Sequence, residues 1–492
     1  MRPWRWIPLL SALATFFGSG ACAREWTFRP SMSLTETSTD NVLLAPSGAE
    51  GDVLTSLEPG LSVTGRTRRL NLSTYYRMQS RNYWDHSELN DVTHFLGANS
   101  TFEAVRNNLF VDGFASLFPT HQNTFGRLSN RNSRNVGENQ VDVINYGVSP
   151  RFQYRLGSIA DFRASLRYTK TDTGTTANNN LQAAGSSTGY EQNARLSSIP
   201  NAGRLDWFVN YERQREVGER GISNNSTFER SDVGANLKLN RFFTVTSTVG
   251  YEQNDSSDGG SNSSGATWSL GGIVTPSPRT KVGGRFAHRA FGDTKSFDFS
   301  YRLRRVIING AYTEELRTSA QLLRQQRVFQ TQDVFGNPIA NPNLDANIPL
   351  PSNLLGLRND VFIARTFNAN IGFQQQRGLL TLGVFRTEQS TVGSTVQNAD
   401  TLLGTTLNWN HDFGYRLSGG LSADYQTRSN ERFAGTQDSV YISPYLSYRL
   451  GAHLNSRLSY SYAEETSDQA LDTRFGGGYV ENSVSTTLSY TY

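Results

Sequence analysis

The chain has 492 residues, of which 18% are charged and 36% hydrophobic, with 44 glycines and a single cysteine. This composition excludes an intrinsically disordered chain and a collagen-like fibre. The 47 basic and 43 acidic side chains give a net charge of +4 without a run of five like charges, so we expect no nucleic-acid partner. One cysteine has nothing to pair with, which excludes a disulfide framework.

Residues 1–23 have the pattern of a secretory signal peptide. Arg2 and Arg5 precede an uncharged apolar stretch over residues 7–17, and the segment ends in Ala21-Cys22-Ala23, a cleavage pattern of small residues. The apolar stretch is too short for a transmembrane helix, which needs about 20 residues. We therefore expect Sec-type export. Lipidation of Cys22 is the alternative, disfavoured because no large aliphatic residue stands three positions before it.

From Trp26 to Tyr492 the sequence alternates between apolar and polar residues, which is the period of a β-strand with one apolar face. At the end of the chain Val484, Leu488 and Tyr490 fall on one face, and serines and threonines fall on the other. Helical periodicity is nearly absent. The sequence therefore predicts an all-β chain.

The gaps between the alternating segments are short and long in turn. The short gaps contain Asn and Gly, which favour tight turns. The long gaps are rich in Ser, Thr, Asn, Gly and Pro. They cover residues 172–189, 254–265 and 317–360. Short turns at one end and long loops at the other are typical of outer-membrane barrels. The segments number about 22, and ambiguous stretches near Phe95 and Val361 leave roughly 18 to 24 open.

These patterns predict one domain, residues 24–492, folded as a transmembrane antiparallel up-and-down β-barrel of the outer membrane. A sheet that crosses lipid must close on itself, because hydrocarbon cannot hydrogen-bond a free edge. The mean hydropathy of −0.50 agrees, since only every second strand residue would face lipid. The alternative, a secreted β-solenoid or sandwich, would show a fixed short repeat or two inner apolar faces, and the sequence shows neither.

Three stretches after the leader resemble a known family. Residues 26–31 read Trp-Thr-Phe-Arg-Pro-Ser, residues 36–42 read Glu-Thr-Ser-Thr-Asp-Asn-Val, and residues 57–61 read Leu-Glu-Pro-Gly-Leu. They resemble the opening of the PEP-CTERM system-associated outer-membrane barrels, found with exosortase and exopolysaccharide genes, although Ser38 replaces an aromatic residue of that family. The resemblance implies a role in exporting or assembling surface polysaccharide, with periplasmic export proteins as partners. It supplies no catalytic residue and implies no cofactor.

The last strand ends in Tyr490 and Tyr492. This ending resembles the C-terminal aromatic signal by which the barrel assembly machinery reads outer-membrane proteins. We therefore expect that machinery, together with outer-membrane lipid, as partners.

Charged residues recur on the polar faces of the expected strands. A charge facing lipid costs about 2–4 kcal/mol at the midplane, so these residues should face the lumen and line a pore. They are Arg163, Arg167, Asp206, Glu212, Lys238, Glu252, Asp298, Arg302, Arg449 and Arg457. Two interpretations stay open: a wet wall whose charges pair with one another, or a basic ladder that guides an anionic polysaccharide.

Catalytic and metal sites are not indicated. The six histidines are scattered, and no pair has metal-ligand spacing. Asp85-His86-Ser87 contains the residue types of a hydrolase site and falls in an expected rim loop, but adjacent side chains point apart rather than converge. We expect a solvated loop there, no metal, and no enzyme.

The longest gap, residues 317–360, is far longer than an outer loop requires. It carries apolar residues that need a surface to pack on, and it is stiffened by Pro338, Pro342, Pro349 and Pro351. We expect it to fold over or into the lumen as a gate or constriction. A loop that merely caps the outer rim is the equal alternative.

Two function classes follow. The first is a conduit or assembly component for surface polysaccharide, and the second is a general or sugar-uptake porin. A TonB-dependent receptor is disfavoured, because it needs a long plug domain before a barrel that is here expected to begin directly after the leader.

Overall fold

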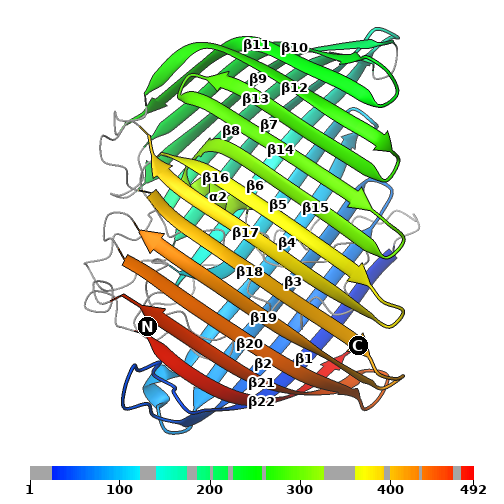
Figure 1. Ribbon diagram of the computed structural model, residues 1–492. Helices are drawn as coiled ribbons and strands as arrows, with labels where there is room; N and C mark the ends of the chain where they lie inside the picture. Colours follow the sequence, from blue (N-terminus) through cyan, green and yellow to red (C-terminus); the bar gives the residue numbers. More distant parts are fainter. Residues whose placement is uncertain are drawn as a thin grey trace.

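A computed structural model describes residues 25–121, 140–173, 186–199, 203–219, 225–257, 262–325, 361–392, 399–430, 435–468 and 478–492. Over these ranges the chain forms 22 antiparallel strands, which run obliquely around a single barrel (Figure 1). The fold predicted from the alternation is confirmed, and the strand number equals the expected value of about 22.

The elements follow one another along the chain with few helical interruptions. The strands are β1 (Glu25–Thr39), β2 (Asp52–Arg66), β3 (Leu70–Tyr83), β4 (Asp91–Val105), β5 (Leu109–His121), β6 (Gln140–Leu156), β7 (Ala160–Thr173), β8 (Ser186–Ser198), β9 (Leu205–Glu219), β10 (Ser226–Lys238), β11 (Phe243–Ser256), β12 (Ser263–Ser277), β13 (Thr280–Arg289), β14 (Gly292–Arg302), β15 (Val306–Arg317), β16 (Phe362–Gln374), β17 (Gly378–Thr391), β18 (Ala399–Asp412), β19 (Leu417–Asn430), β20 (Gly435–Arg449), β21 (Leu454–Ser467) and β22 (Tyr479–Thr491). The helical segments are η2 (Ser87–Leu89) and α2 (Ser319–Gln325). Within the described residues no helix is long and apolar enough to cross a membrane.

The sheet closes because the first strand pairs with the last. β1 pairs with β22 from Ser31 opposite Thr491 to Thr39 opposite Ser483, and every other strand pairs with its neighbours in sequence. Strands about 4.8 Å apart and tilted by about 40° close at a backbone diameter of roughly 40 Å. That width is too large for wall side chains alone to fill.

The connections differ between the two ends of the barrel. At the end that holds the start of β1 and the end of β22, the connections are short turns such as residues 239–242 and 303–305. In the first of these, Asn240 Oδ1 accepts hydrogen bonds from the backbone N–H groups of Phe242 (2.8 Å) and Phe243 (2.9 Å), which holds the reversal. The opposite end carries the longer connections, including residues 40–51 and 318–361. We call it the loop end.

The two faces of the sheet have opposite character. In β22, Ser483 and Ser485 are each 3% exposed, whereas Val484 is 48% exposed. Large apolar side chains are exposed on the same face of other strands. They include Leu34, Val233, Val249, Leu270, Leu382, Leu458 and Leu488. Polar residues inside and apolar residues outside reverse the pattern of a water-soluble protein and fit a barrel in lipid. We call the polar face the lumenal face.

The expected leader, residues 1–23 with Cys22, and the four prolines of the longest gap lie outside the described residues. Of the two ambiguous stretches, Phe95 lies within β4, and Val361 directly precedes β16.

Candidate functional site: the barrel lumen

The structure places all ten charged residues expected to line a pore on the lumenal face. The register shows this from strand to strand: Asp206 lies opposite Asn236, and Asn236 lies opposite Thr246. The same alternation holds for the other nine. They are Arg163 and Arg167 on β7, Glu212 on β9, Lys238 on β10, Glu252 on β11, Asp298 and Arg302 on β14, Arg449 on β20 and Arg457 on β21.

Many of these charges are paired. Lys238 Nζ lies 2.7 Å from Asp206 Oδ2, and Arg167 Nη1 lies 3.4 Å from Glu191 Oε2. The other pairs are Lys281 with Asp298 at 3.4 Å and Arg289 with Glu252 at 2.6 Å. Arg289 reaches past β12 to form two hydrogen bonds to Glu252, so the wall is held together on its concave side as well as through its ladder. The paired-wall interpretation describes this part of the lumen.

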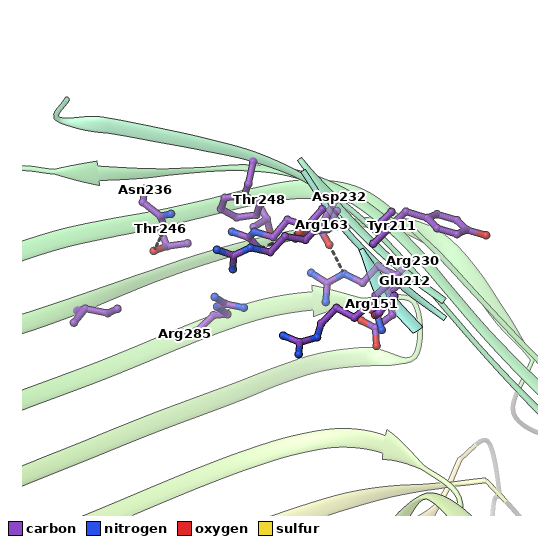
Figure 2. Close-up of a pocket in the computed structure, with 18 residues that line it drawn as sticks. Arg151, Arg163, Tyr211, Glu212, Arg230, Asp232, Asn236, Thr246, Thr248 and Arg285 are labelled. Atoms are coloured by element: carbon purple, nitrogen blue, oxygen red, sulfur yellow. Dashed lines mark hydrogen bonds and ion pairs between the residues drawn. The ribbon is translucent and has the colours of Figure 1, made fainter. Parts of the chain in front are cut away.

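In one sector of the wall the positive charges outnumber the acidic side chains that could pair with them. A cavity of about 630 Å³ opens on the lumenal face between β6 and β13, and five arginines line it (Figure 2). They are Arg151, Arg163, Arg195, Arg230 and Arg285. Its carboxylates are Glu212 and Asp232. We call this place the arginine cavity. Only Arg163 and Glu212 of this set were predicted from sequence.

The first long connection, residues 40–51, folds into the mouth of the barrel. Val42 is 1% exposed and packs on Leu54 and Tyr83, which are lumenal residues of β2 and β3. Leu44 is fully buried and packs on Ala463 and Tyr479, lumenal residues of β21 and β22. We call residues 40–51 the inner loop. Because it contacts the wall on both sides of β1, it narrows the loop end of the lumen.

The stretch that carries the family resemblance anchors this loop. Thr39 Oγ1 donates to Glu481 Oε1 at 2.8 Å, and the carboxylate of Asp40 accepts from the backbone N–H and the side-chain amide of Asn482, each at 2.7 Å. Asn41 Nδ2 donates to the carbonyl oxygen of Val480 at 2.9 Å. These three residues therefore hold β1 to β22 where the barrel closes.

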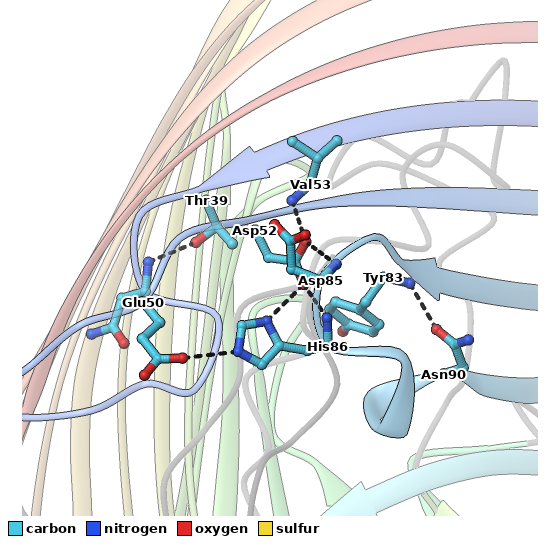
Figure 3. A network of polar contacts seen from close by, with 9 residues as sticks. Thr39, Glu50, Asp52, Val53, Tyr83, Asp85, His86 and Asn90 are labelled. Atoms are coloured by element: carbon cyan, nitrogen blue, oxygen red, sulfur yellow. Dashed lines mark hydrogen bonds and ion pairs between the residues drawn. The ribbon is translucent and has the colours of Figure 1, made fainter.

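His86 joins the inner loop to the connection between β3 and β4 (Figure 3). Its Nδ1 lies 3.0 Å from Asp52 Oδ2, and its Nε2 lies 3.0 Å from Glu50 Oε2. The two hydrogen bonds, that to Glu50 foremost, raise the pKa of His86 above 6.5. With both ring nitrogens bound to carboxylates, the imidazole has no free lone pair to accept a proton from Ser87. Asp85 and Ser87 are exposed, as expected for a solvated loop, and His86 acts within it as a structural clamp.

The sequence did not point to the acids of this clamp. Asp85 was the carboxylate expected near His86, but the contacts come from Glu50 of the inner loop and from Asp52, the first residue of β2, 36 and 34 positions earlier. Within the described residues, no group of three or more His, Cys, Asp or Glu could hold a metal ion.

The start of the longest gap enters the lumen. After β15, α2 lies against the lumenal face of the barrel, where Gln321 Nε2 donates to Gln214 Oε1 of β9 at 2.8 Å. α2 also contacts β7, so the chain crosses from one sector of the wall to another. Residues 326–360, with their four prolines, lie outside the described residues.

The terminal tyrosines lie at the short-turn end on the outer side of the barrel. Tyr490 is 45% exposed and Tyr492 is 69% exposed. The ring of His453, in the turn before β21, stacks against Tyr492 with centroids 5.7 Å apart. The backbone N–H of Tyr492 donates to the carbonyl oxygen of Pro30 at 3.1 Å, which extends the β1–β22 ladder to the last residue.

Comparisons with protein families and with curated proteins found no match for the sequence. Among solved structures the chain is similar to the apoprotein form of the FrpB iron transporter from Neisseria meningitidis, at 11% identity and a TM-score of 0.52, covering 94% of this chain and 81% of that one. It is also similar to the siderophore receptor PirA from Acinetobacter baumannii, at 12% identity and a TM-score of 0.51, covering 94% and 80%. At these identities the likeness shows the fold alone: a closed antiparallel barrel of the kind found in Gram-negative outer-membrane proteins.

Proposed function

We propose that this chain is an outer-membrane protein whose lumen conducts a hydrophilic polymer, and that the polymer is a surface polysaccharide under export. The observation that carries the proposal is the reversed burial of the wall: hydroxyl, amide and charged side chains face inward, and large apolar side chains face outward. Such a wall is stable only with lipid outside and water inside.

The chemistry of the lumenal face supports passage of a sugar polymer. From β16 to β20 this face carries many uncharged polar side chains. Among them are Thr366, Asn368, Asn370, Asn408, Ser422 and Ser447. Hydroxyl and amide groups both donate and accept hydrogen bonds, so they can exchange partners with successive sugar hydroxyls. No single strong contact would therefore hold the sugar polymer in place.

The resemblance of residues 26–61 to barrels found with exosortase and exopolysaccharide genes also supports export. Part of that stretch joins the first strand to the last through hydrogen bonds of Thr39, Asp40 and Asn41. These residues therefore have a structural role in the barrel. The export role therefore rests on the resemblance and on the wall chemistry together. Periplasmic export proteins would be the partners at the short-turn end.

A porin for sugars or small solutes is the second candidate. The paired charges on the lumenal face and the inner loop at the mouth favour it, since both would suit a channel with a size limit. The two candidates differ in the length of glycan that can pass.

Release of trapped glycans from liposomes tests both. The purified barrel is reconstituted with fluorescent neutral glucans of graded length, and protein-free liposomes serve as the control. Release of long glucans supports the conduit, and release of only the shortest members supports the porin. Retention of every glucan, with no conductance in planar bilayers, would overturn both.

Membrane insertion is checked on the same preparation. A closed barrel resists detergent until boiled, so unboiled and boiled samples should migrate differently on a gel. Equal mobility together with extraction by carbonate would contradict an integral barrel.

A further inference from the structure

The arginine cavity holds more positive charge than its own acids offset. Five guanidinium groups and two carboxylates line it, an excess of three positive charges if all are ionised. Its volume of about 630 Å³ lies within the range of small-molecule and cofactor sites. Figure 2 shows the side chains of Arg151, Arg163, Arg230 and Arg285 on different strands of the wall around a shared space.

The two acids already have partners. Asp232 Oδ1 lies 3.0 Å from Arg230 Nε, and Asp232 Oδ2 accepts from Asn210 Nδ2 at 2.9 Å. Glu212 Oε1 accepts from Gln214 Nε2 at 2.5 Å. Asp232 is therefore paired with Arg230, while Glu212 keeps its negative charge and forms its hydrogen bond with a neutral amide.

The remaining arginines differ in how they are held. Arg195 donates to Asn210 Oδ1 at 2.9 Å and lies over the ring of Phe208 at 4.3 Å, so its guanidinium is fixed without an acid. Arg151 pairs with Asp112 at 3.3 Å, with both side chains partly exposed. Within the part of the chain that the structure describes, Arg163 and Arg285 make no side-chain hydrogen bond and no ion pair.

The strand register places two of these arginines directly opposite each other, which lowers the stability of the sheet. Arg163 on β7 lies directly opposite Arg195 on β8. Like charges at directly opposed positions destabilise a sheet. Elsewhere on the wall the same conflict is avoided, as where Arg167 on β7, four residues further along the strand, faces Glu191 on β8. An anion bound in the cavity between the two guanidinium groups would relieve their repulsion.

We propose that the arginine cavity is a binding subsite for an acidic oligosaccharide segment, whose carboxylates are held by Arg163 and Arg285. This deepens the proposed function and rests on it. The planar guanidinium fork matches a carboxylate with two parallel hydrogen bonds. Asn193, Ser165 and Thr246, which line the same cavity, supply neutral donors and acceptors for sugar hydroxyls.

The test compares two double variants of the intact barrel in planar bilayers. R163Q/R285Q removes the two unpaired arginines of the cavity. R29Q/R66Q removes the same charge from two arginines on the lumenal faces of β1 and β2, outside the cavity. The probes are a galacturonate hexamer, inorganic phosphate and maltohexaose, each added in a concentration series while current block is recorded.

The expected result is block of the wild type by the galacturonate hexamer, with the half-blocking concentration raised by about tenfold or more in R163Q/R285Q. R29Q/R66Q should stay close to the wild type. Equal block in all three proteins would overturn the site. Block by phosphate as strong as that by the hexamer, or equal block by maltohexaose, would overturn its assignment to an acidic glycan.

Failure of the proposed function gives a different outcome. If the barrel conducts nothing, binding of the galacturonate hexamer to the detergent-solubilised protein is measured by calorimetry. Binding that R163Q/R285Q loses and R29Q/R66Q keeps would support the subsite although transport had failed. Absence of binding to the wild type would overturn it. A shifted gel mobility before boiling shows that each variant has folded.

Discussion

The side-chain amide of Asn41 donates a hydrogen bond to the main-chain carbonyl oxygen of Val480 over 2.9 Å, across 439 positions of the sequence. The same side chain bonds both backbone groups of Ala45, accepting from its N–H at 2.8 Å and donating to its carbonyl at 2.9 Å. Asn41 is 1% exposed. One amide thus shapes the inner loop and ties it to the last strand.

Replacing Asn41 with alanine should destabilise this end of the barrel. The change leaves the N–H of Ala45 and the carbonyl of Val480 without this partner, and an unsatisfied buried polar group costs about 1–3 kcal/mol. The temperature at which the unboiled gel band converts to the boiled form should fall. Asn82→Ala, at an exposed position of β3, is the control and should leave that temperature unchanged. A midpoint for Asn41→Ala equal to that of the control would contradict this role.

The barrel itself could be predicted from the sequence because its signal is local. In β22 each lumenal serine sits between two outward-facing residues, so the period of two is visible without knowing which strands pair. The clamp at His86 could not be predicted. Its acids, Glu50 and Asp52, come close only because the inner loop folds back into the mouth, and no pattern around residue 86 reports that fold.

The arginine cavity could be predicted from the sequence only in part. Arg151 alternates cleanly with Phe152 and Tyr154 in β6, so its lumenal position could have been found. Arg285 follows two glycines in β13, which interrupt the alternation. Arg195 follows the run Tyr190-Glu191-Gln192-Asn193, which gives no clear face. That these strands bring their arginines together depends on the register of the closed sheet, which the sequence does not show.

The clamp at His86 should make the loop end sensitive to pH. Hydrogen bonds to Glu50 and then Asp52 raise the pKa of His86 above 6.5, and the charge of Glu88 adds to them. A raised pKa means that the stabilisation is fully present below pH 6.5 and is lost as the pH rises through the folded-state value. The thermal midpoint of the wild type should therefore fall from pH 6 to pH 9.

His86→Gln should flatten that pH profile, since its side chain does not titrate. Asn82→Ala, at an exposed position of β3, should keep the profile of the wild type. Identical slopes for the wild type and His86→Gln would show that the clamp does not act as an ion pair.

Tyr492 should matter more for assembly than for synthesis. Tyr492 extends the β1–β22 ladder through its N–H and stacks on His453, and it ends the strand that must close the barrel. Tyr492→Lys should lower the membrane-inserted pool while total protein stays the same, measured by fractionating periplasm and membranes. Tyr415→Lys, at an exposed turn position, is the control. Equal insertion of both variants would remove the argument for a C-terminal signal.

The inner loop should limit the conductance of the pore. Its buried Val42 and Leu44 pack against the wall on both sides of β1, so the loop occupies part of the mouth. Replacing residues 43–49 with Gly-Ser-Gly keeps Asn41, the clamp acids and the β1–β22 contacts. Single-channel conductance in planar bilayers should rise. Unchanged conductance in a variant with normal gel mobility would place the constriction elsewhere.

The segment between β15 and β16 is the other candidate for that constriction, and its gate role stays a prediction. Its first residues, in α2, already lie against the lumenal face, where Gln321 contacts Gln214. A segment that starts inside the wall has a short path to the centre of a lumen roughly 40 Å wide at the backbone. Excision of residues 337–352 with a short Gly-Ser bridge removes all four prolines and the apolar residues among them. We expect higher conductance and passage of longer oligosaccharides than in the intact protein, because the apolar, proline-containing part of the segment that would fill the lumen is removed. The inner-loop variant is the matched comparison. A rise in conductance only after excision of residues 337–352 assigns the constriction to this segment, and a rise only in the inner-loop variant assigns it to residues 40–51.

If the excised barrel inserts normally and its conductance and oligosaccharide permeability equal those of the intact protein, the segment only caps the rim, and the gate hypothesis is wrong.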